Sequence, residues 1–187
     1  MKTVAIFGGT FDPIHFGHLR TALELKQNLK LDEIRLMPCH VPAHRTQPHY
    51  SAQDRLRMVE LAIAPEPELS CDSREIEREG VSYMADTLAI LRDELGDQIS
   101  LILVVGMDSF LSLPSWHEWE EIPQLAHIIV AARPGASGPT QGIMERFLHA
   151  REATDIAELK ASGFGRVLVQ RMTPLAISST HIRALIQ

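Results

Sequence analysis

Cysteine is scarce in this sequence, which has only Cys39 and Cys71 among its 187 residues. Two cysteines cannot build the disulfide framework of a small secreted protein, and no CxxC metal signature occurs. Both observations indicate a protein of a reducing compartment.

Basic charge and long apolar segments are also missing. Lys and Arg number 18 against 24 Asp and Glu, so the formal net charge is −6. Because affinity for nucleic acid grows with the number of phosphates that basic side chains neutralise, we expect no nucleic-acid partner. The apolar run in the N-terminal "MKTVAIFGGTFD" is too short for a signal-peptide core, and no later run approaches a membrane span. We therefore expect a cytoplasmic protein with no membrane partner.

What the sequence does contain is a regular alternation of short apolar runs and amphipathic stretches. Hydrophobic residues make up 45%, which is enough to form the core of a single domain over residues 1–187. The pattern predicts strands at 3–7, 33–38, near 70–77, at 99–106, 127–135 and 166–172. It predicts helices at 18–31, 51–64, 83–95 and 143–161, with Ser51 as an N-cap and Gly96 as a stop. This order is typical of a Rossmann-like, doubly wound and mostly parallel α/β sheet.

The stretch "GGTFDPIHFGH" (8–18) follows the first predicted strand, where such sheets bind ligands. Gly8 and Gly9 allow a sharp turn and close approach of a ligand, and the helix that follows offers N–H groups to an anion. His15 and His18 are about one turn apart, so both rings can donate to one phosphate chain. Neither GxxxxGK[ST] nor GxGxxG occurs. The stretch therefore predicts a phosphate clamp, although a glycine turn with two ordinary helix-entry histidines is an alternative.

A second anion site is indicated by "ISSTHIR" (177–183), which follows the last predicted strand. Ser178, Ser179 and Thr180 are helix-capping residue types, and Arg183 lies about one turn further on. Taken alone, the segment could also be a helix cap with a solvated arginine. The combination of HxGH after the first strand with ISSTxxR after the last is much more specific than either motif.

With these two motifs the sequence resembles the nucleotidylyltransferase superfamily, in which they hold a nucleoside triphosphate. Within it, the sequence looks like the bacterial nicotinate-nucleotide adenylyltransferases. That closer likeness rests on 8–18, "VPAHR" (41–45), "SYMADTL" (82–88), "VGMDSFLSLPSWHEW" (105–119), "ARPG" (132–135) and 177–183. The resemblance implies the reaction of ATP with nicotinate mononucleotide to give deamido-NAD and pyrophosphate, a step of NAD biosynthesis.

The resemblance also implies a site for ATP. His15, His18 and Arg183 would be the catalytic residues, stabilising charge on the departing pyrophosphate. Mg²⁺ would arrive bound to ATP, without a dedicated protein site. Asp108 would lie near the ribose, although it could instead be a helix N-cap, and Arg133 would lie along ATP unless it forms a surface salt bridge. The full predicted ATP site is Gly8, Gly9, Thr10, Phe11, His15, His18, Gly106, Asp108, Arg133, Ile177, Ser178, Ser179 and Arg183.

The acceptor nucleotide is predicted to bind beside ATP. Trp116 offers an aromatic face to a cationic pyridinium, whereas Trp119 is assigned to packing. By resemblance, Tyr83 and the backbone at Met84 would meet the pyridine carboxylate, and His44 and Arg45 would lie near the nucleotide phosphate. The histidines and Cys39 of the 38–50 stretch raise zinc as an alternative, but its three prolines prevent a regular helix and no metal is expected.

Three positions depart from the family pattern: Cys39 where Asn is frequent, Ala43 where Pro is frequent, and Met84 where Thr is usual. The chain also ends four residues after Arg183, so we expect it to lack the C-terminal helical segment usual in the family. Two alternatives stay open: another adenylyl- or cytidylyltransferase, such as one acting on phosphopantetheine, and a nucleotide-binding regulatory module without turnover. Preference for the acid or the amide acceptor, and the oligomeric state, are not predicted.

Overall fold

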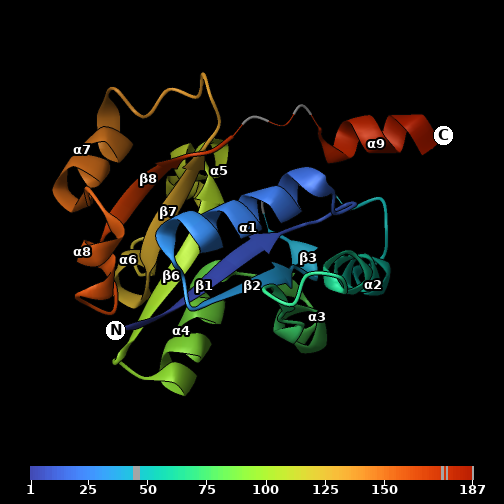
Figure 1. Cartoon of the computed structure of the whole chain (residues 1–187), viewed down its shortest axis with the longest axis horizontal. Helices are drawn as coiled ribbons and strands as arrows, with labels where there is room; N and C mark the ends of the chain where they lie inside the picture. The colour runs from blue at the N-terminus through green and yellow to red at the C-terminus, as the bar shows by residue number, and fades with distance from the viewer. Residues whose placement is uncertain (44–46, 174, 176, 187) are drawn as a thin grey trace.

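A six-stranded parallel sheet forms the centre of the computed structural model, which describes residues 1–43, 47–173, 175 and 177–186 (Figure 1). The strand order is β4-β2-β1-β6-β7-β8, and every neighbouring pair is parallel. The strands are β1 (Lys2–Gly9), β2 (Glu33–Pro38), β4 (Ser70–Cys71), β6 (Ile99–Gly106), β7 (His127–Ala132) and β8 (Val167–Arg171). The predicted doubly wound α/β fold is confirmed.

Two apolar layers explain why the central strands are continuous hydrophobic runs. The helices that pack on one face of the sheet are α4 (Met84–Leu95), α5 (Met107–Leu111), α6 (Ile122–Leu125) and α7 (Gly142–Arg151). Those on the other face are α1 (Phe16–Leu29), α2 (Ala52–Ile63) and α8 (Ile156–Lys160). Alternate residues of β6 enter the two layers, so Leu103 faces the first and Val104 the second. A strand covered on both faces needs apolar side chains on both.

Several predicted boundaries are wrong. The strand expected over 70–77 is only Ser70–Cys71, because the polar stretch after it forms the short helix α3 (Arg74–Arg78). The helix expected over 143–161 is two helices, α7 and α8, separated by a break at 152–155. A short parallel pair, β3 (Val41–Pro42) with β5 (Val81–Ser82), was not predicted. The other strands and helices lie within a few residues of their predicted ranges, and Ser51 and Gly96 occupy the predicted cap positions.

The direction of winding reverses between β1 and β6. From β1 the chain proceeds outward to β2 and β4, and from β6 it proceeds outward to β7 and β8. Loops that leave these two strands at their carboxyl ends therefore diverge to opposite sides and leave a crevice between them. This is the point at which the fold positions its site.

The last helix, α9 (Ser179–Ile186), lies at one end of the molecule (Figure 1). None of its residues is buried, and Leu185 and Ile186 are exposed. Within the described part of the chain, no helix has both the length and the apolarity required to cross a bilayer.

Candidate active site

A large cavity of about 1060 Å³ opens at the carboxyl ends of β1 and β6. Its walls come from the β1–α1 loop, the segment after β6, the loop after β7 and the start of α9. All the predicted ATP-site residues except Ile177 line it. The two motifs read from opposite ends of the sequence thus meet in one cavity.

The two motif histidines are held by a reciprocal capping arrangement at the start of α1. His15 is the N-cap residue, and its Nδ1 accepts from the backbone N–H of Gly17 at 3.1 Å. Nδ1 of His18 in turn accepts from the backbone N–H of His15 at 3.3 Å. Because a backbone N–H can only donate, each neutral ring carries its proton on Nε2. Nε2 is therefore the atom with which each ring can donate to a phosphate oxygen.

Packing fixes the planes of these rings. The imidazoles of His15 and His18 stack with centroids 3.8 Å apart, and Phe11 meets the His18 ring edge-on at 5.1 Å. Burial lowers the pKa of His15 below 6.5, and the positive charge of Arg133 lowers it further. His15 is only 7% exposed and is neutral at pH 7. His15 therefore offers the cavity a hydrogen-bond donor rather than a positive charge.

Glycine is required at two points of the motif by contacts within the protein. A Cβ on Gly17 would lie 2.9 Å from the His15 ring and 3.0 Å from Cγ2 of Ile177. A Cβ on Gly9 would lie 3.0 Å from the ring of Phe11. Gly17 therefore allows the ring of His15 to cap the helix and also allows the second motif to approach the first.

The second motif contacts the first directly. Ser179 Oγ donates to the carbonyl of Pro13 at 2.8 Å, and the guanidinium of Arg183 donates to the carbonyl of Asp12. Arg183 also lies 3.5 Å from the Asp12 carboxylate and donates to Thr180 Oγ at 3.2 Å. The predicted convergence of His15, His18 and Arg183 on one place is therefore present in the geometry.

The residues after β6 form another part of the cavity wall. Gly106, not Asp108, is the N-cap of α5, so the N-cap alternative for Asp108 is wrong. Asp108 is exposed in the first turn of α5 and lines the cavity. A Cβ on Gly106 would meet no protein atom within 4 Å, which leaves that space to a ligand. Arg133 lines the same cavity, and no described carboxylate forms an ion pair with it.

Tyr83, Met84 and Trp116, which are predicted to contact the acceptor nucleotide, also line the cavity. Tyr83 is the N-cap of α4 but gives it no side-chain cap, and its ring lies 4.3 Å from that of His117. A Cβ added to Gly8 would lie 2.8 Å from the Met84 methyl group, so this methionine packs beside the first glycine of the motif. Trp116 is half-buried and packs on the core as well as lining the cavity.

Trp119, His44 and Arg45 are not among the described residues that line the cavity. Trp119 packs edge-on against Phe147 at 5.5 Å, so the prediction of a packing role is confirmed. His44 and Arg45 lie outside the described residues, and the prediction that they contact the acceptor phosphate stays a prediction.

Sequence reasoning missed Arg55 and Glu75. Arg55 is a charged residue of the amphipathic helix α2, yet its side chain is only 1% exposed. It donates to backbone carbonyls of three segments around the cavity, at Thr10 (2.8 Å), Cys39 (2.7 Å), His40 (2.7 Å) and Tyr50 (3.3 Å). No sequence signal distinguishes such a buried arginine from a solvated one. It holds the β1–α1 loop against the 38–50 stretch.

One described group of side chains has the spacing of metal ligands. Asp86, His117 and Glu118 place their ligand atoms within 4.8 Å of one another, and all three are exposed. His40, from the stretch considered for zinc, instead has its Nδ1 3.1 Å from the carbonyl of Gly80.

A parallel sheet with a crevice at its switch point is typical of nucleotide-binding proteins, and the family model described as cytidylyltransferase-like matches residues 6–185. The chain belongs to this family. A protein of Cellvibrio japonicus named "Probable nicotinate-nucleotide adenylyltransferase" is 50% identical over 186 residues, covering 98% of this chain and 87% of the relative. One of Marinomonas sp. with the same name is 47% identical over 182 residues, covering 97% and 82%. The predicted resemblance to nicotinate-nucleotide adenylyltransferases is confirmed, and with it an enzyme of the nucleotidyltransferase class.

A solved structure supports the same fold at greater distance. The nicotinic acid mononucleotide adenylyltransferase of Plasmodium falciparum, complexed with NaAD, superposes with a TM-score of 0.72 over 100% of this chain and 85% of the other. The two chains share 18% identity, so this likeness concerns the fold.

Proposed function

We propose that the protein transfers the adenylyl group of ATP to nicotinate mononucleotide, giving deamido-NAD and pyrophosphate. The observation that carries the proposal is that His15, His18 and Arg183 line one cavity together with Tyr83 and Trp116. The names of the relatives point to the same acceptor.

The chemistry asks for alignment and charge stabilisation rather than for a base. The second pKa of a phosphate monoester is about 6, so the acceptor phosphate is already mostly dianionic near pH 7. Its oxygen attacks the α-phosphorus of ATP, the bond from that phosphorus to the bridging oxygen breaks, and pyrophosphate leaves with the electron pair. The Nε2–H groups of the two histidines can donate hydrogen bonds to the leaving group, and the Arg183 guanidinium can neutralise part of its charge.

Magnesium is proposed to arrive as part of the ATP substrate. On the phosphate side, the described lining consists mainly of N–H donors. The Asp12 carboxylate there already accepts from the backbone N–H groups of His49 at 2.9 Å and Tyr50 at 3.0 Å. A carboxylate engaged in this way is poorly suited to a dedicated ion, and Mg²⁺ readily stays with substrate phosphates and water.

The acceptor end is proposed to favour the acid over the amide. Backbone N–H groups in the first turn of α4, which Tyr83 leaves without a side-chain cap, can donate to a carboxylate. A neutral amide accepts more weakly and must place its own NH₂ against donors. Trp116 supplies the aromatic face for the pyridinium. A cytoplasmic location is the remaining part of the proposal.

The test is pyrophosphate release with ATP and a panel of acceptors: nicotinate mononucleotide, nicotinamide mononucleotide and phosphopantetheine. We expect kcat/KM for the acid to exceed that for the amide about tenfold or more, since a charge-assisted hydrogen bond contributes about 1.5–3 kcal/mol. Equal values, or a preference for the amide, would contradict the carboxylate assignment. Turnover with phosphopantetheine alone would indicate the other transferase, and nucleotide binding without any release would indicate a regulatory module.

A further inference from the structure

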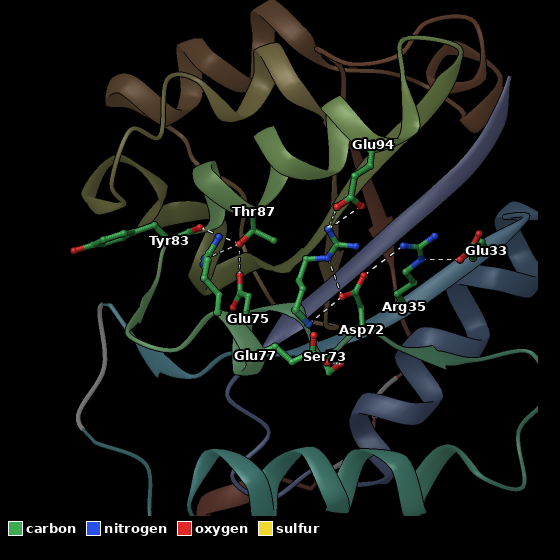
Figure 2. A network of polar contacts seen from close by, with 11 residues as sticks. Glu33, Arg35, Asp72, Ser73, Glu75, Glu77, Tyr83, Thr87 and Glu94 are labelled. Carbon is green, nitrogen blue, oxygen red and sulfur yellow. Dashed lines mark hydrogen bonds and ion pairs between the residues drawn. The ribbon is translucent and has the colours of Figure 1, made fainter.

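A buried carboxyl group lies beneath the acceptor end of the cavity, where none was predicted. Glu75, on α3, is 2% exposed, yet it contributes to the cavity wall together with Ser82, Tyr83 and Met84. Figure 2 shows its side chain directed at Thr87, whose hydroxyl donates to Glu75 Oε1 at 2.7 Å. The partner is thus a residue of α4, the helix whose first turn faces the acceptor.

Thr87 connects this carboxyl group to the start of α4. Its backbone N–H donates to the carbonyl of Tyr83 at 3.2 Å, which is the first helical hydrogen bond, and its Oγ lies at the same distance from that carbonyl. Arg78 donates to Thr87 Oγ at 3.1 Å, so this hydroxyl accepts one hydrogen bond and donates its own proton to Glu75. The position of the hydroxyl therefore sets the position of the first turn.

The second partner of Glu75 belongs to the other wall. The Ser82 hydroxyl lies close enough to the Glu75 carboxyl group to lower its pKa, and Ser82 Oγ accepts from the backbone N–H of His40 at 2.9 Å. His40 lies between β2 and β3, at the entrance of the 38–50 stretch. The carbonyl of His40 is in turn held by Arg55 at 2.7 Å. A series of polar contacts thus runs from His40 through Ser82 and Glu75 to Thr87 in the first turns of α4.

Burying a carboxyl group at this position costs free energy that an apolar side chain of similar size would not cost. Burial raises the pKa of Glu75 above 4.5, because a carboxylate is poorly solvated there, although the Thr87 and Ser82 hydroxyls and the charge of Arg78 oppose the shift. A leucine or methionine would fill the same space without this cost. What the carboxyl group adds is two directed contacts to two different segments of the cavity wall.

We propose that Glu75 is a positioning residue for the acceptor nucleotide, which rests on the proposed function. Through Thr87 it fixes the first turn of α4, whose N–H groups meet the pyridine substituent. Through Ser82 and His40 it fixes the base of the 38–50 stretch in the matching position. ATP is expected to bind along the two phosphate motifs, and none of the predicted ATP-site residues forms a described hydrogen bond with Glu75 or Thr87.

The experiment compares Glu75→Gln and Thr87→Val with the wild type and with Glu77→Gln as the matched control. Glu77 is exposed on the same short helix and bonds only to Ser73 among the described contacts, at 2.5 Å. The glutamine replaces the carboxylate that accepts from Thr87 by a neutral amide, and the valine removes the Thr87 hydroxyl at equal volume. KM for ATP, KM for nicotinate mononucleotide and kcat are measured for each, together with thermal unfolding.

We expect each variant to raise KM for nicotinate mononucleotide about tenfold and to leave KM for ATP within about twofold, because small displacements of positioning groups are costly. The double variant should be little worse than the worse single variant, since both act through one network. Thr87→Ser should restore most of the loss, and Glu77→Gln should match the wild type.

Other outcomes overturn the proposal. Unchanged KM for the acceptor in folded variants, or equal rises for both substrates, would give Glu75 only a general structural role. If Glu75→Gln does not fold, Thr87→Val and Thr87→Ser decide alone by the same criteria. A wild-type protein inactive with nicotinate mononucleotide would overturn the proposed function itself, whereas an active wild type with unaffected variants overturns only the role of Glu75.

Discussion

Replacing Gly17 by alanine should separate activity from stability. Gly17 is the second residue of α1, where alanine is a better helix former than glycine by up to about 1 kcal/mol. The added Cβ would, however, lie 2.9 Å from the His15 ring, and ordinary contact begins near 3.4 Å. The ring must withdraw, because Cγ2 of Ile177 would lie 3.0 Å from the same Cβ and leaves the methyl group little room to move away.

The substitution should change the free energy of unfolding little and kcat strongly. Withdrawal of the ring weakens its 3.1 Å hydrogen bond from the Gly17 N–H, and loss of an N-cap costs about 0.5–2 kcal/mol. The free energy of unfolding should therefore change by about 1 kcal/mol or less once the propensity gain is included. A ring displaced by about 0.5 Å should lower kcat about tenfold to a hundredfold, because catalytic donors tolerate such shifts poorly.

The assay pairs urea unfolding with pyrophosphate release, using Gly138→Ala as the control. Gly138 lies in the exposed connection after β7, and a Cβ there would meet nothing within 4 Å. The control should keep wild-type turnover. Turnover of Gly17→Ala within about threefold of the wild type would refute the idea that glycine is needed to seat His15, because the capping ring would then tolerate the methyl group.

Four further results are expected. His18→Ala should lower turnover about 10²- to 10³-fold while ATP still binds in a titration, and near-normal turnover would exclude it as a leaving-group donor. Arg183→Lys keeps the charge but not the bridge to Asp12, so most of the loss seen in Arg183→Ala should persist; full activity of the lysine variant would contradict a geometric role. Trp116→Ala should raise KM for the acceptor about threefold to tenfold with partial recovery in Trp116→Phe, and an unchanged KM would assign the side chain to packing. Burial lowers the pKa of His127 below 6.5, so below that pH the unfolded chain binds a proton that the folded chain does not. The free energy of unfolding should therefore be highest above pH 6.5 and decrease below it, more steeply in the wild type than in His127→Asn. Parallel pH curves for the two proteins would exclude this histidine as the cause.

The parts of the fold that periodicity determines were predictable. A continuous apolar run such as 99–106 has one favourable environment, a central strand covered on both faces, and it forms β6 at the predicted residues. The polar stretch 70–77 has no such constraint. Only two of its residues pair with β2, and the rest forms a helix anchored by ion pairs, with Asp72 between Arg35 at 3.3 Å and Arg74 at 2.8 Å (Figure 2).

Some of the site residues could likewise be predicted from the sequence, whereas others could not. His15, His18 and Arg183 could be predicted because their spacing places them at helix starts, and helix starts at strand ends meet in this fold. Arg55 and Glu75 could not be predicted, because their role depends on which backbone carbonyls and hydroxyls lie nearby after folding. The packing of Met84 could not be predicted either: a Cβ on Gly8 would lie 2.8 Å from its methyl group, so the longer side chain packs beside that glycine.

The central position of β1 has a consequence for how the protein acquires its activity. Its first residues pair with a distant segment, with Lys2 opposite Ile99, and such pairing forms slowly because the intervening chain must be ordered first. The cavity draws its walls from both halves of the chain, so a partly folded chain has no phosphate clamp. Nucleotide that binds only the finished cavity also holds the halves together, and at a concentration one hundred times its Kd it adds about 2.7 kcal/mol to the folded state. The cellular supply of ATP would then set the lifetime of the enzyme as well as its rate.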